Sequence, residues 1–366
     1  MRNMKNALLL TALCLMLALS ACASPAPLPE GEAVVAEVPT LPSAPVAPVE
    51  QTTPAWQLAG ERPYSTWAVY WDTADVLAEL APVADTLGAL CYFEAFFTAD
   101  GALTLPDAVV ALYASVEESY PENAWQSYLT FVNDVQKPDG SFDLKSAAPL
   151  RAVLADTAAM DAHSDALIDF TRAHGFDGVE IDYEAIRKAP ELWQPFVQFC
   201  ERLYAKTQAA GLGLRVVLEP IAPYAELRFP YGPTYVIMCY NLHGGHNDAG
   251  PKADYDFLNE LMQDAATLPT KPLFALATGG YDWDEHGDAT QVTLRAAHEL
   301  YTQYGQGSSV RDGRSGAIAF RYQAENGKLH TVWCADKRTL ALWAQTLQRA
   351  GYPALSFWRL GGNYIR

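Results

Sequence analysis

Basic residues are scarce in this chain. Its 366 residues include 25 Lys and Arg against 43 Asp and Glu, which gives a formal net charge of −18. A protein that binds nucleic acid needs a basic surface to neutralise phosphates. The shortage of basic residues therefore argues against a nucleic-acid partner, and it leaves a neutral glycan open as a ligand.

Cysteine is scarce as well. Only six occur, and four of them lie beyond the N-terminal segment: Cys91, Cys200, Cys239 and Cys334. They are far apart, their neighbours are apolar or aromatic, and no pair has the spacing of zinc ligands. Buried free thiols are the favoured interpretation, and a single disulfide remains open in an exported protein.

Long apolar runs are missing too. The longest candidate, residues 7–18, is too short for a membrane span and has no stop-transfer pattern. Arg2 and Lys5 precede it, as in the positive region of a secretory signal peptide. The chain also has no glycine-rich loop of the kind that cradles phosphates.

The residues after this run indicate a lipoprotein. Leu19-Ser20-Ala21-Cys22 resembles a bacterial lipobox, in which Cys22 becomes the lipidated first residue of the mature protein. The alternative is an ordinary cleaved signal peptide, residues 1–22, with an incidental cysteine. We expect an exported, membrane-anchored lipoprotein on the cell surface or the periplasmic face.

A proline-rich segment follows. Residues 24–55 contain eight prolines and show neither a helical nor a strand period. Such a composition is typical of a semi-extended linker. We therefore divide the chain into residues 1–22, a tether over residues 23–60, and a folded domain over residues 61–366.

One local pattern recurs in the folded part. An amphipathic helix ends at a glycine, and a short apolar strand follows closely, which is typical of αβ units on a parallel sheet. The helix faces and their glycines are Leu167, Phe170 and His174 before Gly175; Leu192, Phe196, Cys200 and Leu203 before Gly211; and Leu340, Trp343, Ala344 and Leu347 before Gly351.

Eight strands are predicted in all. A domain of this length with eight such strands favours a closed (β/α)8 barrel, that is, a TIM barrel, over an open doubly wound sheet. The predicted strands are residues 67–71, 89–93, 128–132, 176–184, 214–218, 235–240, 273–276 and 354–358.

A small α+β insertion is predicted before the last strand. Residues 281–335 are too long for a simple connection, and they alternate in polarity over residues 316–322 and 329–333. Asn326 and Gly327 stand between these two runs, and Asn-Gly between alternating runs indicates a β-hairpin.

The predicted strand at 176–184 carries three acids. Glu180, Asp182 and Glu184 share one side at the two-residue strand period, and Val179 and Ile181 share the other. Three carboxyl groups on one face of a buried strand repel each other and lose hydration. A fold tolerates this when the face lines a site that uses the charge, and catalytic groups of barrel enzymes lie where strands meet their loops.

Together these motifs resemble the family 18 glycoside hydrolases, over about residues 65–361. The family's central motif corresponds to Asp177-Gly178-Val179-Glu180-Ile181-Asp182-Tyr183-Glu184, and its sixth-strand motif to Met238-Cys239-Tyr240-Asn241. Trp358 corresponds to the aromatic residue of its eighth strand. The hairpin resembles that of the spore-cortex and peptidoglycan-cleaving branch through Phe320, Tyr322, His330 and Trp333.

The resemblance implies a retaining reaction in which the 2-acetamido oxygen of the substrate is the nucleophile. Glu184 would be the general acid and base, and Asp182 would hold the acetamido N–H. Tyr240 would donate a hydrogen bond to the acetamido oxygen, and Trp358 would stack on the sugar. No metal or organic cofactor is implied. The expected partner is a polysaccharide containing β-linked N-acetylglucosamine, either peptidoglycan or a chitin-like polymer.

The motif departs from the family at Glu180, where Asp or Asn is usual. Its longer side chain moves the carboxyl outward by about 1.5 Å, so Glu180 is either a substrate contact or a structural hydrogen-bonding partner. Asn241, Trp71 and Phe93 complete the expected substrate contacts.

Other interpretations remain. Tyr240 and Trp358 fit barrel-core aromatics as well as site residues. His243 and His246 suggest a metal, but neither a helix nor a third ligand accompanies them, so we assign none. A carbohydrate-binding lipoprotein with weak or no turnover is the alternative to a glycosidase.

Overall fold

The computed structural model describes residues 62–305 and 309–363. The expected signal peptide, the lipidation site at Cys22 and the whole proline-rich tether lie outside these residues. None of the helices formed by the described residues has the length and apolar character that a membrane crossing requires.

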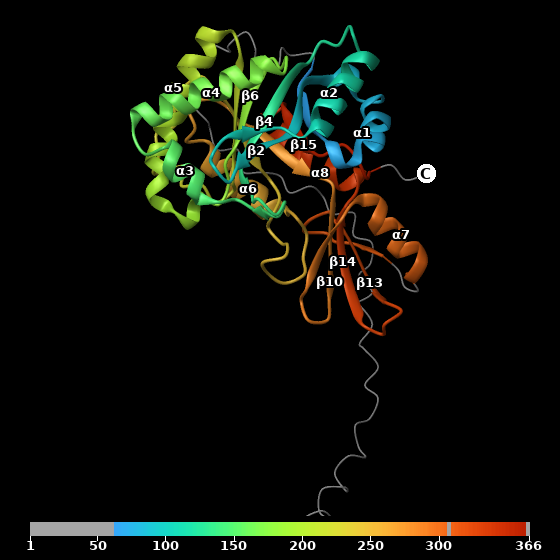
Figure 1. The fold of residues 1–366 in the computed structure, drawn as a ribbon. Coiled ribbons are helices and arrows are strands. Elements are labelled where there is room, and N and C mark those ends of the chain that lie inside the picture. The colour runs from blue at the N-terminus through green and yellow to red at the C-terminus, as the bar shows by residue number, and fades with distance from the viewer. Residues whose placement is uncertain (1–61, 306–308, 364–366) are drawn as a thin grey trace, which may run out of the picture. The chain divides into compact units, whose positions relative to one another are not determined.

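Eight parallel strands close into a barrel at the centre of the folded part (Figure 1). Each strand pairs with the next around the barrel, and the last, β15, pairs with both β9 and β1. In pairing order the strands are β1 (Tyr64–Val69), β2 (Leu87–Thr98), β4 (Gln126–Gln136), β6 (Gly178–Asp182), β7 (Gly213–Leu218), β8 (Thr234–Met238), β9 (Leu273–Ala277) and β15 (Leu355–Trp358). The prediction of a (β/α)8 barrel is confirmed.

Helices connect the strands and cover the barrel from outside (Figure 1). Short 3-10 turns lie at η1 (Tyr70–Asp72), η2 (Ala84–Thr86), η3 (Ile186–Lys188) and η4 (Pro190–Leu192). The α-helices are α1 (Thr73–Leu80), α2 (Asp107–Ser119), α3 (Ala147–Val153), α4 (Thr157–Ala173), α5 (Trp193–Ala210), α6 (Tyr255–Ala265), α7 (Leu294–Tyr304) and α8 (Lys337–Arg349).

The predicted helix ends are also confirmed. Gly175, Gly211 and Gly351 follow α4, α5 and α8 with φ of 81°, 73° and 90°. In this left-handed region a residue with a side chain is disfavoured, so glycine allows the chain to turn back toward the sheet. At the other end of two helices, the side chains of Asp156 and Asp336 accept the N–H groups of Ala159 and Thr339.

The core has two layers. A large apolar cluster lies between the strands and the helices and includes Val179 and Ile181. A smaller cluster fills the barrel interior and includes Trp67, Tyr128 and Met238. The alternation along β6 therefore points its aliphatic residues at the helices and its acids into the barrel.

A second sheet follows β9. It contains β10 (Gly279–Asp284), β11 (Ala289–Val292), β12 (Val310–Arg311), β13 (Ile318–Gln323) and β14 (Leu329–Ala335), in the order β11-β10-β14-β13-β12. β13 and β14 pair antiparallel with Gln323 opposite Leu329, which confirms the Asn-Gly hairpin. Side chains of α7 pack on one face of this sheet.

Two short strands extend the barrel sheet. β3 (Leu103–Thr104) pairs antiparallel with the end of β2, and β5 (Phe142–Asp143) pairs antiparallel with the end of β4. The strands β2 and β4 therefore rise beyond the barrel at their carboxyl ends. The loop that follows β5 returns over this end, and it carries Lys145.

Several strand boundaries differ from the predicted ones: the strand predicted at 176–184 is β6 (Gly178–Asp182), and the one predicted at 235–240 ends at Met238. The first strand also differs. The strand predicted at 67–71 ends at Val69, and Tyr70 and Trp71 belong to η1. The Thr73 hydroxyl donates to the carbonyl of Tyr70 at 2.8 Å, which holds this turn directly before α1. Trp71 consequently leaves the sheet and is 47% exposed.

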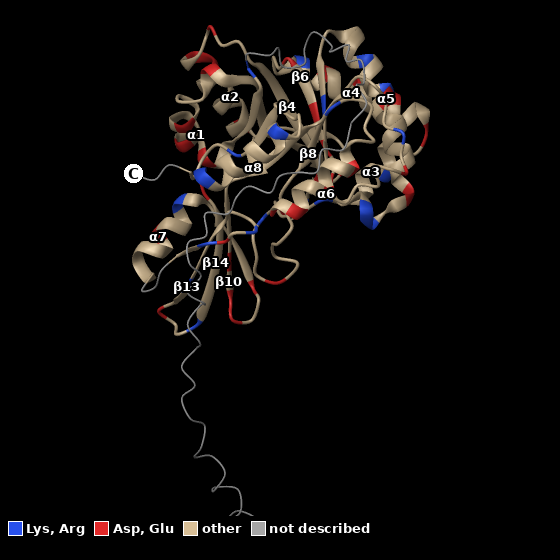
Figure 2. Ribbon diagram, turned by 180° about the vertical axis from the view of Figure 1, so that it is seen from behind, with Lys and Arg blue, Asp and Glu red and all other residues tan. Residues whose placement is uncertain are grey.

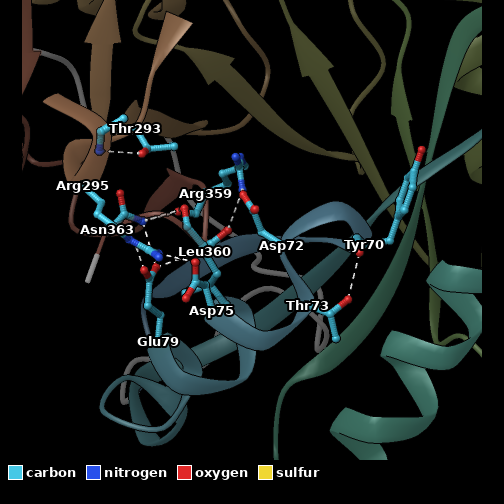
Figure 3. A network of polar contacts seen from close by, with 12 residues as sticks. Tyr70, Asp72, Thr73, Asp75, Glu79, Thr293, Arg295, Arg359, Leu360 and Asn363 are labelled. Carbon is cyan, nitrogen blue, oxygen red and sulfur yellow. Dashed lines mark hydrogen bonds and ion pairs between the residues drawn. The ribbon is translucent and has the colours of Figure 1, made fainter. Parts of the chain in front are cut away.

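A polar network fixes the chain after β15 against α1 (Figure 3). Arg359 pairs with Asp72 at 2.6 Å, and the carboxylate of Glu79 accepts the N–H groups of Gly361 and Asn363 at 2.7 and 2.6 Å. Arg295, in the first turn of α7, pairs with Asp75. The network therefore positions the residue before it, Trp358, from the α1 side of the barrel.

Candidate functional site

Glu180 lies inside the barrel and is fully buried. Its Oε2 accepts from Nε of Arg215 at 2.6 Å, and its Oε1 accepts from Nε1 of Trp67 at 2.6 Å and from Oγ1 of Thr130 at 2.7 Å. The thiol of Cys91 adds a weaker contact at 3.4 Å. Protein groups thus occupy both oxygens, which favours the structural interpretation of Glu180 over a substrate contact.

Asp182 lies one step closer to the barrel mouth and is 6% exposed. Its Oδ1 is buried and has no hydrogen-bond partner among the residues that the structure describes. Burial raises the pKa of this carboxyl well above its usual range, and repulsion from Glu184 and Glu180 raises it further. Asp182 can therefore hold a proton or accept a hydrogen bond from a ligand.

Glu184 follows β6 at the carboxyl end of the barrel. Its side chain is 16% exposed and forms an ion pair with Nζ of Lys145. Its backbone is fixed by Asn133, because Oδ1 accepts the Glu184 N–H at 2.8 Å and Nδ2 donates to the Glu184 carbonyl at 3.0 Å. The predicted acid is therefore at the barrel mouth, as expected for a catalytic carboxyl.

Three more carboxyls surround Glu184, from the ends of β2, β4 and β7. Burial raises the pKa of Glu94 to about 8, and repulsion from Asp134 and Glu184 adds to this effect. The pKa values of Asp134 and Glu219 are also raised, by burial first and by Glu184 in addition. Lys145 interacts electrostatically with all of these carboxyls and partly offsets their repulsion.

This concentration of acids is local. In the view of Figure 2, Lys and Arg form short separate stretches among Asp and Glu, without a continuous basic stripe on the described elements. The mouth combines several carboxyls with one close ammonium group, and burial keeps protons on part of them. Such a set is suited to proton transfer near neutral pH.

Tyr240 joins these acids from the end of β8. Burial raises the pKa of its phenol, and the negative charges of Asp182 and Glu184 are the next causes. A protonated phenol within electrostatic reach of both carboxyls can donate a hydrogen bond to a ligand between them. Asn241 follows it, exposed and in the left-handed region at φ 79°, which asparagine tolerates better than most residues.

A row of aromatic rings crosses the same end of the barrel. Trp358 lies edge-on against Trp67 at 5.7 Å and against Phe93 at 4.9 Å between ring centroids. Phe93 contacts Trp71 at 6.0 Å, and the guanidinium of Arg359 lies 5.4 Å from the Trp71 ring. Trp358, Phe93 and Trp71 therefore form an aromatic surface of edge-to-face contacts, with interplanar angles of 77° and 84°, on which a sugar would stack against a single ring at a time.

The second sheet contributes Tyr281 of β10. Burial raises the pKa of this phenol, and Glu184 and Lys145 both lie within its electrostatic reach. Lys252 lies 5.7 Å from the Tyr281 ring and donates to the carbonyl of Thr278 at 2.9 Å. Burial lowers the pKa of Lys252 to about 8. Lys252 was not predicted as a site residue from the sequence.

The predicted site residues thus fall into two groups. Asp182, Glu184 and Tyr240 interact with one another, and Trp358, Phe93 and Trp71 form the aromatic surface. Glu180 lies beneath the first group.

The described residues show no metal centre. Over residues 62–305 and 309–363, no three His, Cys, Asp or Glu side chains gather in a way that could hold a metal ion. His243 uses Nδ1 to contact the carbonyl of Asp248 at 2.9 Å. The four cysteines of the described domain are buried and free, which confirms the favoured interpretation.

Several site residues had a sequence signal that was not used. Asn133 and Glu219 come directly after the strands predicted at 128–132 and 214–218, and Asp134 follows Asn133. Polar residues at that position meet at one end of a parallel barrel. Lys145 had no such signal, because it lies on the loop after β5 and reaches Glu184 across 39 positions of the chain.

Comparisons with known proteins agree with this fold. The chitinase from Chromobacterium violaceum ATCC 12472 superposes with a TM-score of 0.66 at 24% identity, covering 82% of this chain and 95% of that one. The Bacillus cereus spore cortex-lytic enzyme SleL gives a TM-score of 0.66 at 18% identity, covering 82% of this chain and 71% of its own. Both likenesses establish the barrel fold.

Two relatives found by sequence have similarly low identity. The uncharacterized glycosylase YvbX of Bacillus subtilis (strain 168) is 21% identical over 224 residues, which is 58% of this chain and 65% of YvbX. YdhD of the same organism is 23% identical over 256 residues, and the match covers 59% of it. The chain therefore spans less than two thirds of either relative. No protein-family model matches it.

Proposed function

We propose that this chain is a glycoside hydrolase of the family 18 type, which cleaves β-linked N-acetylglucosamine polymers. The observation that carries the proposal is the arrangement of Asp182, Glu184 and Tyr240 at the mouth of a closed barrel, with mutual electrostatic contact. A chitinase and a spore cortex-lytic enzyme share this fold, and YvbX is named a glycosylase, which supports the same chemistry.

The proposed reaction assigns one role to each group. Glu184 gives a proton to the leaving glycosidic oxygen while the 2-acetamido oxygen of the substrate attacks the anomeric carbon from the opposite face. Asp182, whose Oδ1 has no hydrogen-bond partner within the described part of the chain, accepts the acetamido N–H. Tyr240 donates to the acetamido oxygen. Glu184 then takes a proton from water, which attacks the anomeric carbon with overall retention.

Sugar binding is assigned to the aromatic surface. Trp358 contacts Phe93, which in turn contacts Trp71, so sugars would stack on the faces of these rings. Peptidoglycan and chitin-like polymers are the proposed substrate classes. Asn241, exposed beside Tyr240, is the proposed polar contact at that end of the row.

A membrane anchor at Cys22 remains part of the proposal. The lipobox-like residues support it, and an outer surface of the cell is where such glycans occur. Replacing Cys22 by Ser is expected to abolish incorporation of labelled palmitate and to release the protein from the membrane fraction. Unchanged labelling of the Cys22→Ser variant would refute the anchor and leave the enzymatic proposal intact.

A second candidate is a glycan-binding protein with little or no turnover. The ion pair between Lys145 and Glu184 favours it, because it engages the carboxyl that the reaction needs as an acid. In that case the protein binds N-acetylglucosamine oligomers and leaves them uncut over long incubation.

The deciding experiment compares wild type, Glu184→Gln and Glu191→Gln on N-acetylglucosamine oligomers and on purified cell-wall glycan, with products identified by mass spectrometry. Glu191 is the matched control, because it also pairs with a basic residue, Arg151, but on the exposed surface. We expect wild type and Glu191→Gln to release products, and Glu184→Gln to be slower by about 10²–10⁴-fold. Equal release by all three would refute the assignment of Glu184.

A further inference from the structure

The segment that presents Glu184 is held by hydrogen bonds from two other strands. On one side, the amide of Asn133 pairs with both backbone groups of Glu184, at 2.8 and 3.0 Å. On the other side, Oε2 of Glu219 accepts the N–H of the next residue, Ala185, at 2.8 Å. Asn133 lies in β4 and Glu219 directly follows β7, and these strands flank β6 in the barrel.

Asn133 also fixes the partner of Glu184. Its Nδ2 donates to the carbonyl of Ser146 at 3.0 Å, and its own carbonyl accepts the Ser146 N–H at 3.0 Å. The neighbouring Asp134 accepts the N–H of Lys145 at 2.6 Å. The end of β4 therefore places both members of the Lys145–Glu184 ion pair. Asn133 is 1% exposed, so no water competes for these bonds.

The backbone at Ala185 shows why a clamp is needed. Its φ is 59° and its ψ is 20°, which is the left-handed region that a residue with a Cβ disfavours. Such a conformation persists where its surroundings impose it, and it is common at functional sites. The bond from the Ala185 N–H to Glu219 is the contact that holds this peptide in place.

We propose that Asn133 and Glu219 are positioning residues for Glu184: from either side of β6 they fix the peptides of residues 184 and 185, and so aim the Glu184 carboxyl at the bond to be cleaved. Neither residue needs to touch the substrate for this role. The kinetic consequence rests on the proposed function, whereas the structural part does not. A displacement of about 1 Å at a reacting group can lower a rate by about 10²-fold.

The kinetic test uses a matched pair at Glu219. Glu219→Gln keeps an oxygen that can accept the Ala185 N–H, and Glu219→Leu removes it at similar volume. We expect Glu219→Gln to keep kcat within about threefold of wild type and Glu219→Leu to lower kcat by about 10- to 100-fold with KM little changed. Equal losses in both variants would show that the charge of Glu219 matters and would overturn its positioning role.

A measurement that does not depend on enzymatic activity, amide hydrogen exchange, separates this proposal from the glycosidase proposal. Backbone amide hydrogen exchange at residue 185 should become about tenfold faster or more in Glu219→Leu, and that at residue 184 should do so in Asn133→Ser. Unchanged exchange at both residues would refute the clamp. If wild type cleaves no glycan, the proposed function fails, and the exchange data still decide the clamp.

Asn133 is tested by two substitutions because it is buried. Asn133→Asp keeps the oxygen that accepts the Glu184 N–H but loses both donated bonds, and Asn133→Ser shortens the side chain. Glu191→Gln, which alters an exposed ion pair with Arg151, is the control. We expect lower kcat in the two Asn133 variants and near-wild-type kcat in Glu191→Gln. Full kcat in a folded Asn133 variant would overturn the proposal.

Discussion

Glu180 and Glu184 occupy one side of the same segment, yet their surroundings differ in burial and in hydrogen-bond partners. Glu180 has no exposure, and Arg215, itself 2% exposed, neutralises it inside the barrel. Glu184 lies at the mouth, where its partner Lys145 keeps 46% of its side chain exposed. The first carboxylate is held by four protein groups, whereas the side chain of the second pairs with Lys145 alone among the described residues.

The difference shows that the depth of a carboxylate in the barrel determines whether its charge serves the fold or the site. A buried ion pair gains little over apolar packing, but breaking it leaves a charge without solvent or partner. A pair at the surface is screened and contributes little to stability. We therefore expect the inner pair to support the fold and the outer pair to serve the chemistry of the site.

The largest effect should follow from breaking the inner pair. Arg215→Met leaves Glu180 buried without its cation, and we expect the free energy of unfolding to fall by about 3–5 kcal/mol. Urea denaturation followed by circular dichroism measures it. Arg151→Met, which breaks an exposed pair, is the control and should change stability by less than about 0.5 kcal/mol. Similar losses in both variants would contradict the comparison.

A second prediction concerns the pH dependence at the mouth. The pKa of Glu94 is raised from 4.5 to about 8, so the folded state binds more protons than the unfolded state between these values. The free energy of unfolding therefore falls as pH rises through this range. Glu94→Gln removes this contribution and should gain stability relative to wild type from pH 5 to pH 8.5.

Urea denaturation at several pH values tests this prediction. Glu118→Gln, at an exposed position of α2, is the control and should follow the wild-type curve. A constant difference between Glu94→Gln and wild type across the range would show that Glu94 titrates alike in both states, and the prediction would be wrong.

The smallest effect is expected at the outer pair. Lys145→Met should change the free energy of unfolding by about 1 kcal/mol or less, because the lysine is half exposed and its charge is screened. Lys206→Met, which breaks the surface pair with Asp165, is the matched control. A loss near that of Arg215→Met would remove the distinction between the two pairs.

Local patterns in the sequence predicted much of the fold. The eight strands, the glycines after α4, α5 and α8 and the Asn-Gly hairpin all depend on residues close in the chain. The two-residue period also placed Glu180, Asp182 and Glu184 on the inner face. These features follow from backbone geometry, which short segments specify by themselves.

Contacts between segments that are distant in the chain could not be predicted from the sequence. Glu180 is bound by Arg215 and Trp67, which lie 35 and 113 positions away in the chain. The strand period predicts which face of the sheet a residue occupies, but not how deep in the barrel it lies. Lys145 pairs with Glu184 from an irregular loop. Trp71 lies outside the predicted strand because η1 forms before α1. Tertiary packing determines these contacts and the position of Trp71, and local sequence patterns do not specify them.

The central claim is that Glu184 protonates the departing oxygen, and leaving-group dependence tests it most directly. The measurement compares kcat/KM of wild type and Glu184→Gln on an N-acetylglucosamine oligomer and on its 2,4-dinitrophenyl glycoside, whose leaving group needs no proton. We predict a loss of about 10²–10⁴-fold on the oligomer and of about tenfold or less on the activated glycoside. An equal loss on both substrates, or no loss on either, would contradict the account.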